Sequence, residues 1–169
     1  MEKGNSLEKA QKAYANANDQ ERKLLEGIFG PSVVVKPLRE TIKGIADVIR
    51  QSGKSATAFK MNAKTPIKKK AAIQLELIET IFEVFREGKK VNTGDTKQQK
   101  WYPYFKVVQD DKAPAGFRLA FNAAVCDIDY AILGARPKFV VFTQADAAFI
   151  GKTFTDEFTK LFQYENLAQ

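Results

Sequence analysis

Hydrophobic positions in the first half of the chain recur every three or four residues, which is the period of an amphipathic α-helix. The strongest run, between Pro66 and Gly88, predicts one long helix. Asn18 and Glu21 have the spacing of a capping box and indicate that another helix begins at Asp19. The β-branched run at residues 33–35 is instead expected to be extended. We expect four helices in this half, at residues 6–17, 19–29, 37–53 and 65–88.

After residue 100 the hydrophobic pattern changes to alternation, the period of a half-buried β-strand. The aromatic run at residues 101–105 predicts that Trp101 and Phe105 point one way, and Tyr102 and Tyr104 the other. Further strands are predicted at residues 117–122, 130–133 and 139–142, followed by one helix at 144–163 that Thr143 caps. The sequence therefore predicts an α+β fold, with a helical half at residues 1–88, a lysine-rich linker at 89–100, and a small antiparallel sheet with one packed C-terminal helix at 101–169.

Three stretches of the chain resemble a group of small uncharacterised proteins from bacteriophages and prophage-like elements of Bacteroidetes. They are Lys-Leu-Leu-Glu-Gly-Ile-Phe-Gly ending at Gly30, Trp-Tyr-Pro-Tyr-Phe at residues 101–105, and Gly-Lys-Thr-Phe-Thr at residues 151–155. In that group a Tyr-Tyr-Pro-Trp-Phe-like strand is followed later by a Gly-Lys-x-Phe-Thr helix. The resemblance implies a phage or mobile-element setting, with the protein in the host cytoplasm or associated with the virion. It implies no functional residues.

The absence of histidine from the sequence narrows the possible chemistry. It removes the Ser-His and Cys-His dyads and the commonest zinc ligand. The single cysteine, Cys126, excludes an intramolecular disulfide and is expected to be a small buried hydrophobic residue. No apolar run approaches the roughly 20 residues that span a bilayer, and no signal peptide is expected. We expect no membrane partner.

Two patterns invite an enzymatic interpretation. Gly151-Lys152-Thr153 resembles the end of a P-loop, but Asp146 stands where that motif needs its first glycine. Gly151 is better interpreted as a close-packing position between a helix and the sheet. Aspartates 110, 111, 127, 129 and 146, with Lys112 or Lys138, would suit a Mg²⁺-dependent nuclease if they converged on one pocket. Since paired aspartates are common in loops, we expect no enzyme, no metal site and no cofactor.

The net charge of +7 is unevenly distributed. Residues 1–60 carry an excess of +4, residues 61–100 also +4, and residues 101–169 an excess of −1. Such asymmetry suits an anionic partner, because lysines bind phosphates and aromatic rings stack on bases. The alternative is structural, with solvated lysines and with the rings in the core. The candidate nucleic-acid-binding residues are Lys64, Lys68, Lys69, Lys70, Lys89, Lys90, Lys97, Lys100, Trp101, Tyr102, Tyr104 and Lys106.

Three functions of different classes follow from these patterns. The first is a non-enzymatic phage accessory protein that binds nucleic acid. The second is a virion-structural or protein-binding component that forms homo-oligomers or binds another phage or host protein, for which Trp and Tyr are also suited. The third is the carboxylate-dependent nuclease. Salt-sensitive DNA binding would distinguish the first from the second.

Overall fold

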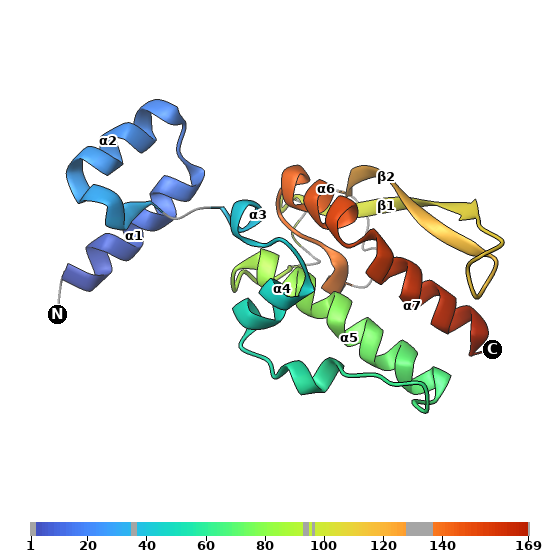
Figure 1. Cartoon of the computed structure of the whole chain (residues 1–169). Helices are drawn as coiled ribbons and strands as arrows, with labels where there is room; N and C mark the ends of the chain where they lie inside the picture. The colour runs from blue at the N-terminus through green and yellow to red at the C-terminus, as the bar shows by residue number, and fades with distance from the viewer. Residues whose placement is uncertain (1–2, 35–36, 93–94, 96, 128–136, 169) are drawn as a thin grey trace. The chain divides into compact units, whose positions relative to one another are not determined.

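A computed structural model describes residues 3–34, 37–92, 95, 97–127 and 137–168 (Figure 1). The α+β prediction is confirmed, because helices fill the first half and later helices pack on a two-stranded antiparallel sheet. The strands are β1 (Lys100–Gln109) and β2 (Phe117–Asp127), and the 3-10 helices are η1 (Gly30–Val33), η2 (Ala56–Phe59) and η3 (Pro137–Phe139). The described α-helices are α1 (Lys3–Asn16), α2 (Asp19–Phe29), α3 (Leu38–Thr41), α4 (Ile45–Ser52), α5 (Ile67–Arg86), α6 (Gln144–Thr153) and α7 (Thr155–Leu167).

The chain forms two compact units, Met1–Ile42 and Lys43–Gln169. In the first unit, α2 begins with the capping box that the sequence predicts. The Asn18 side chain accepts hydrogen bonds from the backbone N–H of Gln20 and Glu21, and the Glu21 carboxylate accepts one from the Asn18 backbone N–H. Leu25 and Phe29 pack against a small core, whose buried members are Ala10, Tyr14 and Val33.

The second unit is layered. Helices α6 and α7 pack on the β1–β2 hairpin, α5 packs on α7, and α4 packs on α5 (Figure 1). The long helix predicted at residues 65–88 is confirmed as α5, which ends at a left-handed Glu87 (φ 50°) and Gly88 (φ 77°). Its core-facing side chains include Ile78, Ile81 and Phe82, all 0% exposed. This buried stripe holds α5 in the centre of the unit.

The hairpin places Phe105 opposite Phe121, with their ring centroids 6.2 Å apart and Phe105 also 4.7 Å from the ring of Phe158. The alternation predicted for β1 therefore holds for Phe105, which is half-buried and packs against the buried Phe158. At its other edge β1 makes one bridge, with two backbone hydrogen bonds between Trp101 and Val141. Pro103 lies two residues after Trp101, so its backbone nitrogen faces the same edge of β1. The N–H that proline lacks is therefore not needed for pairing with β2.

Gly151 in α6 confirms the close-packing interpretation. A Cβ atom on Gly151 would lie 2.2 Å from Cδ2 of Phe121 and 2.9 Å from Cβ of Pro103. Only glycine lets the helix approach both strands this closely. Gly151-Lys152-Thr153, the tripeptide that resembles the end of a P-loop, therefore lies inside α6 and not in a loop before a helix. At Gly151 it packs against the sheet.

Two predicted helices are each divided in the structure. Residues 37–53 form α3 and α4, because the backbone is extended at Gly44 and the Asp47 carboxylate accepts a hydrogen bond from the N–H of Lys43. This bond is the main reason that the pKa of Asp47 lies below its ordinary value. The predicted helix at 144–163 bends at Phe154, where the Thr155 hydroxyl donates to the Gly151 carbonyl. The bend lets α6 lie on both strands while α7 extends along α5.

Other boundaries were also wrong. Helix α1 begins at Lys3, before the predicted cap at Ser6. Val33, expected to be extended, lies in η1 and is 0% exposed, because it fills the small core of the first unit. Within the described part of the chain, residues 139–142 make a single bridge, that of Val141, since η3 takes Phe139 into a helical turn. The strand predicted at residues 130–133 lies outside the described residues.

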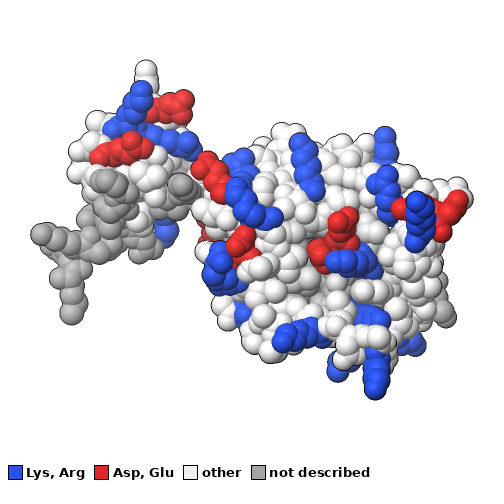
Figure 2. Space-filling model, in the orientation of Figure 1, with Lys and Arg blue, Asp and Glu red and all other residues white. Residues whose placement is uncertain are grey.

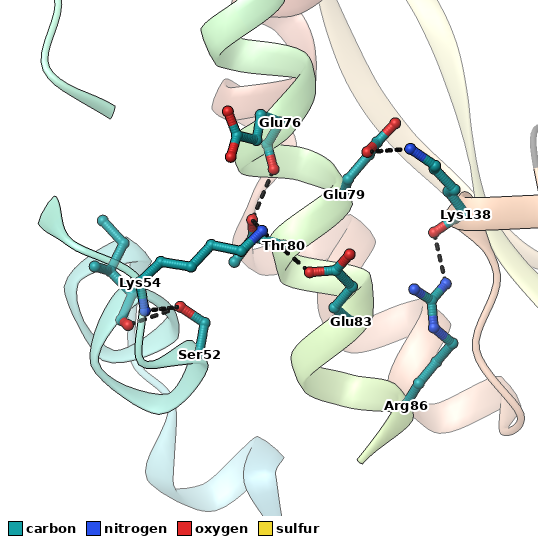
Figure 3. A network of polar contacts seen from close by, with 9 residues as sticks. Ser52, Lys54, Glu76, Glu79, Thr80, Glu83, Arg86 and Lys138 are labelled. Carbon is teal, nitrogen blue, oxygen red and sulfur yellow. Dashed lines mark hydrogen bonds and ion pairs between the residues drawn. The ribbon is translucent and has the colours of Figure 1, made fainter. Parts of the chain in front are cut away.

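A polar network fastens two connecting segments to α5 (Figure 3). On one side, the Lys54 ammonium donates to the Thr80 hydroxyl at 2.8 Å and to the Glu83 carboxylate at 3.1 Å. On the other, Lys138 pairs with Glu79 at 2.7 Å, and Arg86 donates to the Lys138 carbonyl at 2.8 Å. Burial lowers the pKa of the Arg86 guanidinium. The charges of Lys54, Lys138 and Arg86 therefore hold connecting segments against α5.

Candidate functional site

The lysines around the start of α5 form a basic cluster on the second unit. Hydrogen bonds of Asn62 with Thr65 close a tight turn just before the helix, which brings the segments on either side of the turn together. The α5 lysine cluster, as we call it, consists of Lys60, Lys64, Lys68, Lys69 and Lys70. Four of these side chains are exposed and Lys70 is half-buried. The sequence prediction included all of them except Lys60, which a slightly longer charge window would have found.

None of the five ammonium groups in the α5 lysine cluster makes a hydrogen bond or ion pair within the part of the chain that the structure describes. Three lysines elsewhere in the unit, Lys54, Lys138 and Lys160, are each paired with a glutamate. Figure 2 shows Lys and Arg side chains without neighbouring Asp or Glu at the lower edge of this unit, where α5 begins in Figure 1. The cluster therefore has positive charge that the described protein does not neutralise.

The first turn of α5 adds to this charge. It contains no carboxylate, and Pro66 at its N-cap makes no side-chain capping bond. The positive end of a helix macrodipole and its unbonded N–H groups attract anions. Lysines at this end raise the positive potential further. A dianionic or polyanionic ligand would be favoured over a neutral one.

A second group of predicted lysines lies in the loop after α5. Gln98 holds this loop together, because its side chain accepts from the N–H of Asn92 at 2.7 Å and donates to the Lys90 carbonyl at 3.2 Å. Lys89, Lys90 and Lys97 are exposed there. Lys100 is different, since it is 6% exposed and its ammonium donates to the carbonyls of Asp95 and Gln98. Lys100 orders the loop and presents no charge to a ligand.

The aromatic run of β1 is divided between the two faces of the hairpin. Tyr104 is 52% exposed, and Lys106, two residues further on, is also exposed. These two side chains share one face of the strand, opposite the face of Phe105. Trp101 and Tyr102 are half-buried, so they offer less surface for stacking. Of the five predicted stacking and flanking residues on β1, Tyr104 and Lys106 are the accessible pair.

The predicted residues thus fall into three groups rather than one. About 24 Å of helix separates Lys70, the last residue of the α5 lysine cluster, from Arg86 at the end of α5, because the rise is about 1.5 Å per residue. A small ligand cannot reach both ends of α5. A nucleic-acid backbone can, since B-DNA advances about 3.4 Å for each base pair.

The carboxylates expected of a nuclease do not form a metal site within the described residues. No group of three or more Asp, Glu or Cys side chains lies close enough there to hold an ion. Asp110 is used in the hairpin turn, where it accepts from the N–H of Lys112 and pairs with Arg118 at 3.7 Å. Asp129 and the side chain of Asp127 lie outside the described residues, so their distance from Asp110 is not tested.

A scan against protein-family models and searches of curated proteins and of solved structures each found no match for the chain. Among the helices that the structure describes, none is long and apolar enough to cross a membrane. The function is therefore inferred from the site itself.

Proposed function

We propose that this chain is a non-enzymatic accessory protein of a phage or mobile element that binds nucleic acid through the α5 lysine cluster. The observation that carries the proposal is the concentration of unpaired ammonium groups at the start of α5, in a unit whose other lysines include several paired with glutamate. Lysines that neutralise phosphates release condensed counterions, which gives affinity with little sequence preference. The phage setting, with a location in the host cytoplasm or the virion, rests on the sequence resemblance alone.

Tyr104 and Lys106 extend the proposed interface to β1. An exposed ring can stack on an unpaired base, which contributes about 1–3 kcal/mol for each base. Single-stranded nucleic acid therefore suits this surface better than a duplex, whose bases are already stacked. The loop lysines Lys89, Lys90 and Lys97 would contact the same strand at the far end of α5.

The test is fluorescence anisotropy with labelled single- and double-stranded DNA at about 50 and about 200 mM salt. We expect tighter binding to the single strand and a steep loss of affinity at the higher salt. The triple variant Lys68→Ala, Lys69→Ala, Lys70→Ala should reduce the slope of log K against log salt by about 0.7 for each phosphate that is no longer neutralised. A binding constant that does not change with salt would contradict the proposal, as would no binding at the lower salt concentration.

A matched triple variant separates location from total charge. Lys43→Ala, Lys112→Ala and Lys152→Ala remove the same three charges, but from exposed lysines of the same unit that lie outside the α5 lysine cluster. Binding should stay close to wild type in this variant. Tyr104→Ala should weaken single-strand binding while Tyr104→Phe should not, because phenylalanine keeps the stacking surface. If both triple variants lose equal affinity, only net charge matters and the α5 lysine cluster is not a site.

A protein-binding role is the second candidate, and one observation favours it. Leu24 and Ile28 lie four residues apart on α2, and each is 64% exposed. Neighbouring exposed apolar side chains on one helix face are common in protein interfaces. Light scattering of wild type and of the double variant Leu24→Gln, Ile28→Gln tests this role. A wild-type oligomer that dissociates in the variant would support self-association.

A further inference from the structure

The second unit contains a partly open pocket that the nucleic-acid proposal does not use. It has a volume of about 310 Å³ and lies between α5, β1, η3 and α7. Of the eleven described residues that line it, ten are apolar or aromatic. Pockets of about 300–1,000 Å³ with this type of lining are typical small-molecule sites. The volume corresponds to roughly ten water molecules, and therefore suits a ligand of on the order of ten non-hydrogen atoms.

Packed aromatic rings preform the wall of this pocket. Phe82 lies 5.7 Å from Phe139 and 6.2 Å from Phe158 between ring centroids, and Phe158 lies 4.7 Å from Phe105. Phe82 is 0% exposed and Phe158 is 7% exposed, so neither ring can turn away without disturbing the core. A ligand would meet a rigid apolar surface and would lose little affinity to reorganisation of the protein.

The lip of the pocket carries negative charge. Glu165 is the one charged residue among the described residues that line the pocket, and its carboxylate makes no ion pair or hydrogen bond with any described side chain. It lies in the last turn of α7, where no basic residue is present. The negative end of the helix macrodipole lies at the same place, so carboxylate and helix end repel each other. A cation bound beside Glu165 would be attracted by the carboxylate and by the negative end of α7, and would offset the repulsion between them.

We propose that this aromatic pocket binds a small amphipathic amine. The apolar body of the ligand lies against the phenylalanine rings, and its ammonium group lies at the Glu165 carboxylate, with the half-exposed Phe162 beside it. Aromatic rings also attract cations through their faces, which reinforces the preference over a neutral or anionic ligand. This site is independent of nucleic-acid binding and involves none of the residues of the α5 lysine cluster.

The experiment compares three probes that share one apolar body, 4-phenylbutylamine, 4-phenylbutanol and 4-phenylbutyrate. Each is titrated into the ¹⁵N-labelled full chain, and dissociation constants are taken from amide chemical shifts. We expect the amine to bind about tenfold more tightly than the alcohol, and the carboxylate most weakly. The shifts should concentrate on α5, β1 and α7 around the pocket.

Variants assign the preference to individual residues. Glu165→Gln should remove most of the amine's advantage over the alcohol and leave the smaller part that the aromatic rings contribute, whereas Phe162→Ala should weaken the amine and the alcohol by a similar factor. Both residues are exposed at the lip, so the ¹⁵N spectrum should stay native-like. Glu76→Gln is the matched control, an exposed glutamate on α5 outside the pocket, and should change nothing. Equal binding of the three probes, no binding of the amine at about 10 mM, or an amine preference that Glu165→Gln does not reduce would each overturn the proposal.

Discussion

The two units differ in how their interiors are built. In Lys43–Gln169, fully buried side chains such as Phe82, Phe154 and Ile150 come from different helical segments and meet around a hairpin. In Met1–Ile42, the core cluster has three buried members among the residues whose burial is described, and Leu24 and Ile28 on α2 stay 64% exposed. The larger unit is therefore stabilised by dense packing, and the smaller one depends more on local devices such as its capping box.

This difference bears on where function is expected. Units of about 40 residues are near the lower limit for independent folding, because they bury a small fraction of their surface. Helix α5 belongs to the densely packed unit, so the α5 lysine cluster and the aromatic pocket both lie on elements with fixed positions. Binding there would order few additional groups. Substitutions in the two units, taken from the largest expected effect to the smallest, test this difference in stability. Trp101 fluorescence reports unfolding of the larger unit, and far-UV circular dichroism reports the helix content of the whole chain.

Phe82→Ala should have the largest effect. The ring is 0% exposed and contacts Phe139 and Phe158, so its removal leaves a cavity in the dense core. We expect a loss of about 3–5 kcal/mol in the free energy of unfolding, measured by urea titration of Trp101 fluorescence. Phe162→Ala removes a ring that is 46% exposed and should cost less than about 1 kcal/mol. Equal losses of unfolding free energy in Phe82→Ala and Phe162→Ala would show that packing of the buried core does not stabilise the larger unit.

Gly151→Ala should come next, although it adds only a methyl group. That methyl would lie 2.2 Å from a Phe121 ring carbon and 2.9 Å from Cβ of Pro103 on the neighbouring strand, so α6 would have to move away from both strands. We expect a loss of about 2–3 kcal/mol, again from Trp101 fluorescence in urea. Gly27→Ala on α2 is the matched control, because no atom lies within 4 Å of its added Cβ. It should stabilise α2 by about 0.5–1 kcal/mol.

The sequence predicted best those features that depend on a few neighbouring residues. Asn18 and Glu21 determine the start of α2 by themselves, and Gly88 the end of α5, so local chemistry was sufficient. Gly151 was identified because a glycine inside a helix needs a packing reason. In the caps the physical cause lies within one turn of the chain, and at Gly151 the residue type itself is the signal.

The breaks within helices could not be predicted in the same way. Phe154 continues the apolar stripe of α6 into α7, so periodicity gives no sign of the bend, at which the Thr155 hydroxyl donates to the Gly151 carbonyl. Leu24, Leu25, Ile28 and Phe29 form one apolar face by spacing, yet the core of the smaller unit covers only Leu25 and Phe29. The boundary expected at residues 89–100 follows the change from helices to strands in the sequence. The division into compact units instead falls after Ile42, and α5 packs against α7 within the larger unit.

The candidate site shows the same limit. Charge counting located the α5 lysine cluster, because the segment is contiguous. It also included Lys100, whose ammonium is bound by loop carbonyls that the sequence cannot place beside it. The aromatic pocket was not predicted at all, since its lining comes from four elements far apart in the chain.

Asn18→Ala should have a smaller effect, confined to the first unit. The Asn18 side chain accepts two backbone hydrogen bonds at 3.0 Å, and without it the first turn of α2 loses those partners. Loss of such a cap costs about 1 kcal/mol. Far-UV circular dichroism during thermal unfolding should show earlier loss of helix, with Trp101 fluorescence unchanged. Gln20→Ala, which alters an exposed neighbour whose side chain accepts no capping bond, should leave both signals as in wild type.

The smallest expected effect is a pH dependence at Tyr14, in the core of the first unit. Its hydroxyl donates to the Glu26 carboxylate at 2.5 Å, and this hydrogen bond is the main reason that the pKa of Tyr14 lies above the ordinary value near 10. Because the folded pKa is raised, the stabilisation is complete below about pH 10 and is lost as the pH rises through the folded value.

Unfolding followed by circular dichroism between about pH 9 and about pH 11.5 should therefore show a weakening of the first unit that Tyr14→Phe removes. Tyr104→Phe, at an exposed tyrosine, should keep the wild-type pH dependence. A pH profile identical in wild type and Tyr14→Phe would mean that the Tyr14–Glu26 hydrogen bond does not contribute to the small core. The stability of that unit would then depend on its helix caps and its few apolar contacts alone.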